Sequence, residues 1–232
     1  MAMMKVMTSM TTTRTETDAP PEAPLDCPLC PRLVAYREKN NELEPDWFNA
    51  PVPSFGTSKA ELLVIGLAPG RMGANRTGRP FTGDWAGDLL YPTLKTFGFA
   101  DGDYDARPDD GLKLKSAMIT NAVRCVPPEN KPVGAEINAC RPFLKSRLNA
   151  LPKLKVMITL GKISHDSTVR ALGLKLKDHS FGHAARFEVE TPWHDQPLAL
   201  ISSYHCSRYN TNTGRLTEAM FHDVFRMARD LI

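Results

Sequence analysis

A glycine- and arginine-rich segment, GLAPGRMGANRTGRPFTGD at residues 66–84, directly follows the apolar run ELLVI at 61–65. An apolar run of this length predicts a buried strand, so the segment is a long loop at the carboxyl end of a strand. Open α/β sheets place their ligand sites at such ends. The pair of features therefore favours an α/β fold with a binding site built around this loop.

The residue types of the loop favour a ligand site over a plain connection. Glycines let the backbone approach a ligand closely, and arginines carry permanently charged planar groups suited to phosphate. Phe81 offers a flat face for a base, and Asp84 offers a carboxylate. An arginine-decorated surface loop is the alternative, which the length of the segment disfavours. The glycines and arginines are Gly66, Gly70, Gly73, Gly78, Gly83, Arg71, Arg76 and Arg79.

Composition limits the class of protein. The 232 residues, 42% apolar and 24% charged, suit one ordinary α/β domain, which we expect at 25–232. The net charge of +3 does not by itself indicate nucleic-acid binding, so the arginines would have to be concentrated in one place. Residues 1–24 are polar and proline-rich, which predicts a disordered tail. Without a membrane-length or signal-type apolar run, we expect a cytoplasmic protein, and we expect it to be a monomer.

Strands and helices alternate along the rest of the chain, which predicts a parallel sheet with helices on both faces. Pro92 lies inside the helix expected from Asp84 to Phe97 and predicts a kink or a broken first half. Residues 40–58 and 100–113 are expected to be loops. The expected strands are 61–67, 117–124, 156–160 and 198–203 with a short one at 186–189, and the other helices begin at Pro31, 135, Gly161 and Thr217.

Polar side chains follow three of these strands. They are Asp84 after the first strand, Asn121 and Asn130 at the end of the second, and His205 and Asn210 after the last. The carboxyl ends of parallel strands lie together, so these loops predict a shared cleft. An amide both donates and accepts hydrogen bonds, which suits the reading of a base edge. A lone histidine is more often structural, but the position of His205 in a polar loop after a buried strand favours function.

Four of the five cysteines can reach one point. Cys27 and Cys30 have metal-ligand spacing, and Cys125 and Cys140 are separated by a loop and the first turns of a helix. Four thiolates fit a structural zinc ion or an iron–sulfur cluster, and spacing alone does not choose, although the second CxxC of zinc ribbons is missing. Buried unliganded thiols are the alternative. The fifth, Cys206, follows a histidine, but adjacent residues at a strand end point opposite ways, which disfavours a Cys–His nucleophile.

Four segments together resemble the uracil-DNA glycosylase superfamily, and most closely its B-type, or family 5, iron–sulfur branch. The resemblance spans nearly the whole chain beyond the tail. It implies a three-layer αβα fold with a central parallel four-stranded sheet, a [4Fe–4S] cluster on the first four cysteines, and removal of uracil, with other deaminated bases as further candidates, from DNA. The segments are residues 66–84, NAVRCVPPENKP at 121–132, HCSRYNTNTGRLT at 205–217 and CPLCPRLVAYRE at 27–38.

For such a reaction the target base must leave the duplex. Phe81 is then expected to stack on the flipped base, and Asn121 to read its edge. Negative charge develops on the departing uracil, and His205 is expected to stabilise it through the O2 atom. The other residues that we expect to contact substrate are Gly66, Ala68, Asn210 and Arg79.

The residue that positions the attacking water does not follow directly from the family pattern. Ala68 is apolar where many members of the family carry an acidic or amide residue for this purpose. We therefore expect Asp84, assisted by Asn130, to position water or to offset positive charge on the sugar. A helix N-cap is the other role expected for Asp84, and the two roles can coexist.

The chain departs from the family pattern in two places. Asn121 replaces a small residue that is usual in the branch, which predicts a sharper preference for uracil. Cys206 replaces a proline or valine. A related branch traps the sugar through a histidine in a basic insert, and no such insert follows residues 66–84, so trapping is not expected.

Two other function classes remain open. One is a non-catalytic domain, held together by a bound metal, that recognises damaged or single-stranded DNA. The other is a small-molecule hydrolase or nucleotide-processing enzyme that uses the same cleft. The combination of His205, Asn210 and the FTGD motif at 81–84 favours the glycosylase over both.

Overall fold

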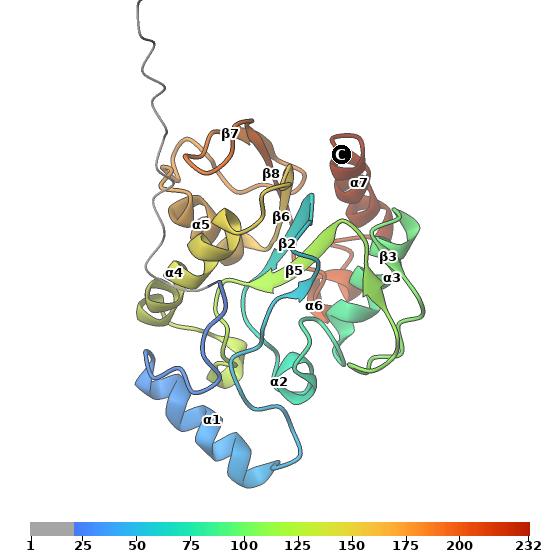
Figure 1. Cartoon of the computed structure of the whole chain (residues 1–232). Coiled ribbons are helices and arrows are strands. Elements are labelled where there is room, and N and C mark those ends of the chain that lie inside the picture. Colours follow the sequence, from blue (N-terminus) through green and yellow to red (C-terminus); the bar gives the residue numbers. More distant parts are fainter. Residues whose placement is uncertain (1–20) are drawn as a thin grey trace, which may run out of the picture.

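The computed structural model describes residues 21–232, which are built around one six-stranded sheet with the strand order β1-β5-β2-β6-β8-β7 (Figure 1). The central strands β5, β2, β6 and β8 pair in parallel, which confirms the predicted four-stranded parallel sheet. Every residue of these strands is buried, because helices cover both faces and leave no polar side to the sheet. Their bounds are β2 Leu62–Gly66, β5 Ala117–Asn121, β6 Val156–Leu160 and β8 Leu198–Ser203.

Short strands occur in both segments that were predicted to be loops. β1 (Phe55–Gly56) pairs antiparallel with β5, and β3 (Ala100–Asp101) pairs with β4 (Lys113–Leu114). Strands of two residues leave no periodicity in a sequence, because their pairing depends on the neighbour that tertiary folding supplies. β7 (Arg186–Val189), which the sequence did predict, closes the other edge antiparallel to β8.

Helices form the two outer layers, so the three-layer arrangement is confirmed (Figure 1). α4 (Gly134–Asn149) and α5 (Lys162–Ala171) contribute Leu144, Leu148 and Val169 to the core on one face. α3 (Trp85–Thr96) and α7 (Glu218–Arg229) contribute Leu90, Leu94, Phe221 and Phe225 to the core on the other. The short helices are α2 (Ala74–Thr77), α6 (Arg208–Asn212) and the 3-10 turn η1 (Pro128–Asn130).

Of the two outcomes predicted at Pro92, the broken helix is wrong, because α3 continues through this residue, and the kink stays a prediction. Pro92 itself is exposed, whereas Tyr91, Thr93 and Leu94 beside it are buried. Packing of the buried face therefore maintains a helix that the missing N–H group would otherwise weaken.

The amino-terminal segment is fastened to the domain before α1 (Pro31–Leu43) begins. Arg124, which is fully buried, donates to the carbonyl of Pro21 at 3.1 Å and pairs with the carboxylate of Glu22 at 3.0 Å. Arg147 also pairs with Glu22. The predicted disordered tail at 1–24 is therefore wrong for its last four residues, and the rest of it lies outside the described residues.

The helices of the described part include none that is long and apolar enough to cross a membrane.

Candidate active site

The carboxyl ends of β2, β5 and β8 open into a cleft of about 480 Å³, a volume that suits a nucleobase and part of its sugar. The loop after β2 forms most of the wall, and the loops after β5 and β8 complete it. The parallel sheet therefore brings the three predicted loops together. The predicted residues that line the cleft are Ala68, Phe81, Asp84, Asn121, Asn130 and His205.

Gly66 provides the space in which Phe81 and Asn121 meet. In the sheet Gly66 is the direct neighbour of Asn121, so a side chain there would project on the same side. A Cβ atom on Gly66 would lie 2.4 Å from Oδ1 of Asn121 and 2.7 Å from Cζ of Phe81. Gly66 does not line the cleft itself. Its contribution is the absence of a side chain, which lets the amide and the ring approach each other.

Asp84 both caps α3 and borders the cleft. Its Oδ1 atom accepts a hydrogen bond from the N–H of Gly87 at 3.2 Å, which confirms the predicted N-cap. Burial raises the pKa of the Asp84 carboxyl, and the N–H groups of Gly87 and Ala86 partly oppose this rise. Oδ2 faces the loop after β2, where Cβ atoms on Gly70 and Gly73 would lie 3.4 Å and 2.5 Å from it. The loop therefore needs glycine at 73 to enclose this carboxylate.

His205 presents a neutral ring to the cleft. Burial lowers the pKa of His205 to about 4, so the ring carries no proton charge at neutral pH. Among the described residues, no side chain or backbone group hydrogen-bonds to either ring nitrogen, which leaves both for a ligand. The ring stacks near Phe81, with 6.1 Å between centroids and 28° between planes.

Asn210 was predicted to contact substrate, and the structure does not bring it into the cleft. Its Nδ2 atom donates to the backbone carbonyl of His205 at 2.8 Å. Its own N–H donates to the hydroxyl of Ser207, which caps α6. Asn210 therefore holds the loop that carries His205. It can do so only after the loop has folded into its turn.

Asn130 reaches the cleft through an uncommon backbone. Glu129 and Asn130 are consecutive left-handed residues, with φ of 55° and 57°. Asparagine tolerates this conformation better than most residues do. The turn projects from the loop after β5 and places Asn130 in the cleft wall.

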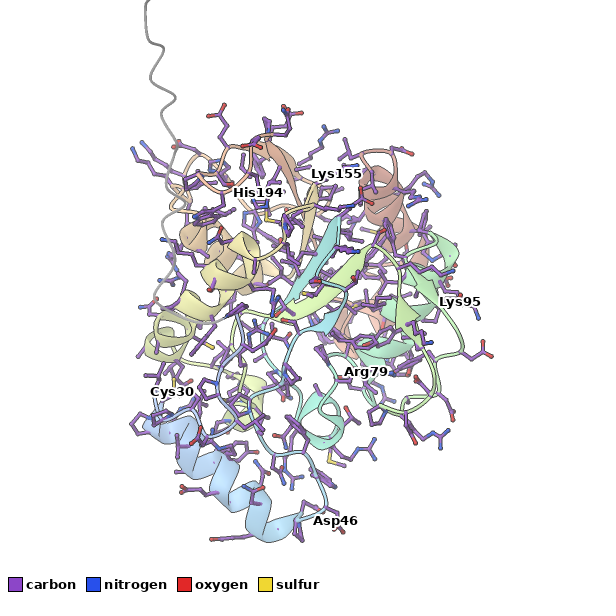
Figure 2. All side chains as sticks on the ribbon, in the orientation of Figure 1. Cys30, Asp46, Arg79, Lys95, Lys155 and His194 are labelled. Carbon is purple, nitrogen blue, oxygen red and sulfur yellow. The ribbon has the colours of Figure 1, made fainter. Side chains whose placement is uncertain are left out.

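Arg79, which was predicted to contact substrate, does not line the cleft. Its guanidinium is buried and forms two hydrogen bonds to Asp110, at 2.8 Å and 2.6 Å. Figure 2 places Arg79 within the body of the molecule, whereas Lys95 lies at its outer edge. A phosphate outside the protein cannot reach a group that is enclosed and already paired.

Two other arginines border the cleft. Arg71, from the loop after β2, lies over the ring of Trp47 and donates from Nε to Asn40 at 2.8 Å. Arg208 lies 5.3 Å above the half-exposed ring of Trp85. Arg208 was not among the predicted site residues, although its position in the polar loop after the last strand was a usable signal.

The four cysteines predicted to act together line one small apolar recess between α1, the end of β5 and α4. Burial raises the pKa of Cys125 to about 12 and that of Cys140 to about 11, and repulsion between neighbouring thiolates adds to both. The backbone N–H of Arg124 donates to Sγ of Cys140 at 3.3 Å. Figure 2 shows Cys30 at the start of α1. Within residues 21–232, no three His, Cys, Asp or Glu side chains are arranged to hold a single metal ion.

Cys206 lies away from this recess. It is fully buried, its thiol donates to the carbonyl of Ala86 at 3.5 Å, and burial raises its pKa. A protonated thiol without access to the cleft cannot act as a nucleophile, in agreement with the sequence analysis.

Comparisons with known proteins show which family the chain resembles along its length. The family model described as the uracil DNA glycosylase superfamily matches residues 53–229. The type-5 uracil-DNA glycosylase of Thermus thermophilus is 43% identical over 211 residues, which cover 88% of this chain and 93% of that protein. The type-5 enzyme of Mycobacterium tuberculosis is 36% identical over 88% of this chain and 78% of its own length. The type-4 uracil-DNA glycosylase of Sulfurisphaera tokodaii is 28% identical over 76% of this chain and 74% of its own.

Proposed function

The chain belongs to the uracil DNA glycosylase superfamily, in its type-5 branch, and from this premise we propose that it hydrolyses the bond between uracil and deoxyribose in DNA, leaving an abasic site. The reaction makes it a DNA-repair hydrolase. The observation that carries the proposal is one cleft that joins a carboxylate, an uncharged histidine, an amide and an aromatic ring. All of these come from one chain, so we propose that it acts as a monomer.

DNA binding must offset the cost of extruding the base, which is about 3 kcal/mol. Arg71 and Arg208 border the cleft and carry the charges suited to the flanking phosphates. The flipped uracil stacks on Phe81. Asn121 hydrogen-bonds to its O4 and N3 edge, where the amide oxygen accepts from N3–H and the amide nitrogen donates to O4. Uracil is preferred because both bonds require its arrangement of donor and acceptor.

His205 stabilises the leaving group. As the glycosidic bond breaks, electrons move onto uracil, and negative charge gathers at O2. A neutral imidazole can donate one N–H to that oxygen. Because no described protein group hydrogen-bonds to the ring nitrogens, no existing bond has to break first. This is the oxyanion type of stabilisation, which is strongest in an enclosed site. The lowered pKa of His205 supports a donor that is uncharged before the reaction begins.

Asp84 acts on the sugar side. Positive charge develops on the sugar, and water must attack it and lose a proton. The raised pKa of Asp84 makes the carboxylate a better acceptor for that proton. Asn130 assists by orienting the water. Capping α3 uses Oδ1, and this leaves Oδ2 for the reaction, so the two predicted roles of Asp84 are compatible.

The cysteine recess suits a [4Fe–4S] cluster, which we propose for Cys27, Cys30, Cys125 and Cys140. Such a cluster takes one thiolate on each iron, so its ligands lie farther apart than those around a single ion. The apolar lining and the N–H group directed at Cys140 fit this donor set. When bound, the cluster supplies a rigid link between segments rather than a reacting group. Ala68 packs against the residues around the thiols and also lines the cleft, which joins the two sites.

The cluster can be tested apart from activity. Purified protein should contain iron and sulfide with broad visible absorbance, and Cys125→Ser should lose them. Cys206→Ser is the matched control, since this buried cysteine lies outside the recess and should leave the iron content unchanged. Stoichiometric zinc in place of iron would refute the cluster.

The reaction is tested by base release from a labelled oligonucleotide with one deoxyuridine, followed by alkaline cleavage at the abasic site. The wild type should release uracil, and His205→Ala should lose most of the activity. Oligonucleotides with deoxyinosine or ethenocytosine then measure the range of bases. A folded wild-type protein that releases no base would overturn the proposal.

A further inference from the structure

A buried ion pair lies beside the segment that carries Phe81. Arg79 and Asp110 form it, and their side chains are only 5% and 1% exposed. The Asp110 carboxylate also accepts from the N–H groups of Asp105 and Leu112, at 3.0 Å and 3.1 Å. Every oxygen of this carboxylate therefore has partners, although it belongs to a surface segment whose other acids, Asp103 among them, are exposed.

The guanidinium of Arg79, besides pairing with Asp110, lies among three aromatic rings that enclose it. Its guanidinium carbon lies 5.1 Å, 5.3 Å and 5.8 Å from the ring centres of Phe55, Tyr91 and Tyr104. The two tyrosine rings stack on each other at 4.6 Å. Cation–π attraction is strongest when the cation is out of water, as it is here. Without the carboxylate of Asp110, the charge inside this enclosure would lack its counterion.

The same tyrosines hold the backbone on either side of Phe81. The hydroxyl of Tyr91 donates to the carbonyl of Pro80 at 2.6 Å. The hydroxyl of Tyr104 donates to the carbonyl of Phe81 and accepts from the N–H of Gly83, both at 3.2 Å. The enclosed arginine thus packs on the two rings whose hydroxyls fasten residues 80–83.

Phe81 needs such support, because its φ angle is 54°. A bulky residue adopts this left-handed conformation rarely, and it persists only where neighbouring groups hold it. Contact is also close on the helix side, where a Cβ atom on Gly87 would lie 1.8 Å from the carbonyl oxygen of Phe81. The strained backbone directs the Phe81 ring into the cleft beside Asn121.

We propose that Asp110 is a positioning residue of this site: through Arg79 it fixes Tyr91 and Tyr104, whose hydroxyls keep Phe81 left-handed and its ring against the flipped base. Asp110 does not line the cleft and does not touch substrate. The inference rests on the proposed function, in which Phe81 stacks on uracil.

Tyr104→Phe provides the sharpest test, because it removes the hydroxyl and keeps the ring that packs on Tyr91 and Arg79. It should slow single-turnover uracil release by about tenfold in the wild-type background, since small misplacements at a reaction centre are costly. In a Phe81→Ala background the same change should have an effect of less than about twofold, because the ring that it positions is gone. An equal loss in both backgrounds, or no loss in either, would overturn the inference.

Asp110→Asn tests the other end of the connection. Release should slow by about tenfold or more at saturating enzyme, while the dissociation constant for an undamaged duplex changes by less than about twofold. Asp103→Asn is the matched control, because it removes an exposed acid of the same segment that pairs with Lys95. A parallel loss of duplex affinity would indicate general damage and refute a positioning role.

These results are separable from a failure of the proposed function. If the wild type and Asp103→Asn release no uracil, the reaction itself is wrongly assigned. If both release uracil and Tyr104→Phe behaves alike in the two backgrounds, the reaction is correct and the positioning role of Asp110 is wrong. Should Asp110→Asn fail to fold, the Tyr104→Phe comparison can still overturn the inference, because the proposed connection from Asp110 to Phe81 passes through that hydroxyl.

Discussion

Gly66→Ala adds one methyl group at the point where the sheet meets the cleft. Gly66 ends β2 and has no left-handed backbone, so alanine can adopt its conformation. The methyl would lie 2.4 Å from Oδ1 of Asn121 and 2.7 Å from Cζ of Phe81. The substitution therefore tests the space between two substrate-binding groups without changing either of them.

The size of the effect follows from these distances. Ordinary contact begins at 3.4 Å, so the amide must retreat by 1.0 Å (3.4 − 2.4) and the ring by 0.7 Å (3.4 − 2.7). Misplacement by about 1 Å at a reaction centre can cost about 100-fold in rate. This corresponds to about 2.7 kcal/mol of transition-state stabilisation. Overpacking should also lower the free energy of unfolding by about 1–3 kcal/mol.

The assay is single-turnover release of uracil from a labelled duplex, with denaturation in urea measured in parallel. Gly134→Ala is the matched control, because a Cβ atom there meets nothing within 4 Å at the start of α4. It should release uracil at the wild-type rate. If Gly66→Ala remains within about twofold of that control, the amide and ring do not need their observed positions, and the reasoning fails.

Three further outcomes are expected. Burial lowers the pKa of His205 to about 4 from an ordinary 6.5, so the rate–pH profile should pass through pH 6.5 without an inflection. Because the unfolded state binds the proton more readily, the free energy of unfolding should fall as the pH drops from 6.5 toward 4. Denaturation measured at each pH would reveal this fall. Asp84→Asn should slow release by about 100-fold or more with little change in melting temperature, since asparagine also caps helices, and unchanged turnover would remove Asp84 from the mechanism. Glu22→Ala should lower the free energy of unfolding by about 2 kcal/mol in urea because it deprives the buried Arg124 of its carboxylate. The exposed Glu129→Ala should change it by less than about 0.5 kcal/mol, and equal effects would contradict the difference in burial.

The central sheet was predictable because its strands are fully buried. A strand covered on both faces is apolar throughout, as in the run at 61–65, and such runs can be located without knowing their partners. The N-cap at Asp84 was predictable for a similar reason, because its bond joins residues that are close in the chain. The cleft followed from topology, since parallel strands with polar residues at their carboxyl ends converge.

The structure places residues differently from the sequence-based expectation where a side chain has two physically reasonable destinations. Arginine suits phosphate, and it equally suits a buried carboxylate inside aromatic rings. Arg79 takes the second because Asp110, 31 residues away, is brought beside it. Asn210 could have entered the cleft, and instead it holds the backbone of His205. Glu22 lay within a tail of disordered composition, and two distant arginines hold it.

The sequence by itself therefore determined the elements whose stability depends on local spacing and burial: the four parallel strands, the helix caps and the loops that gather at one edge. Only the tertiary structure decided which polar groups face the cleft and which support it. Loop side chains obtain their partners after folding, from segments that no short-range pattern connects. A left-handed Phe81, a buried Arg79 and an absent side chain at Gly66 each depend on such neighbours, and so the shape of the site emerges with the folded chain.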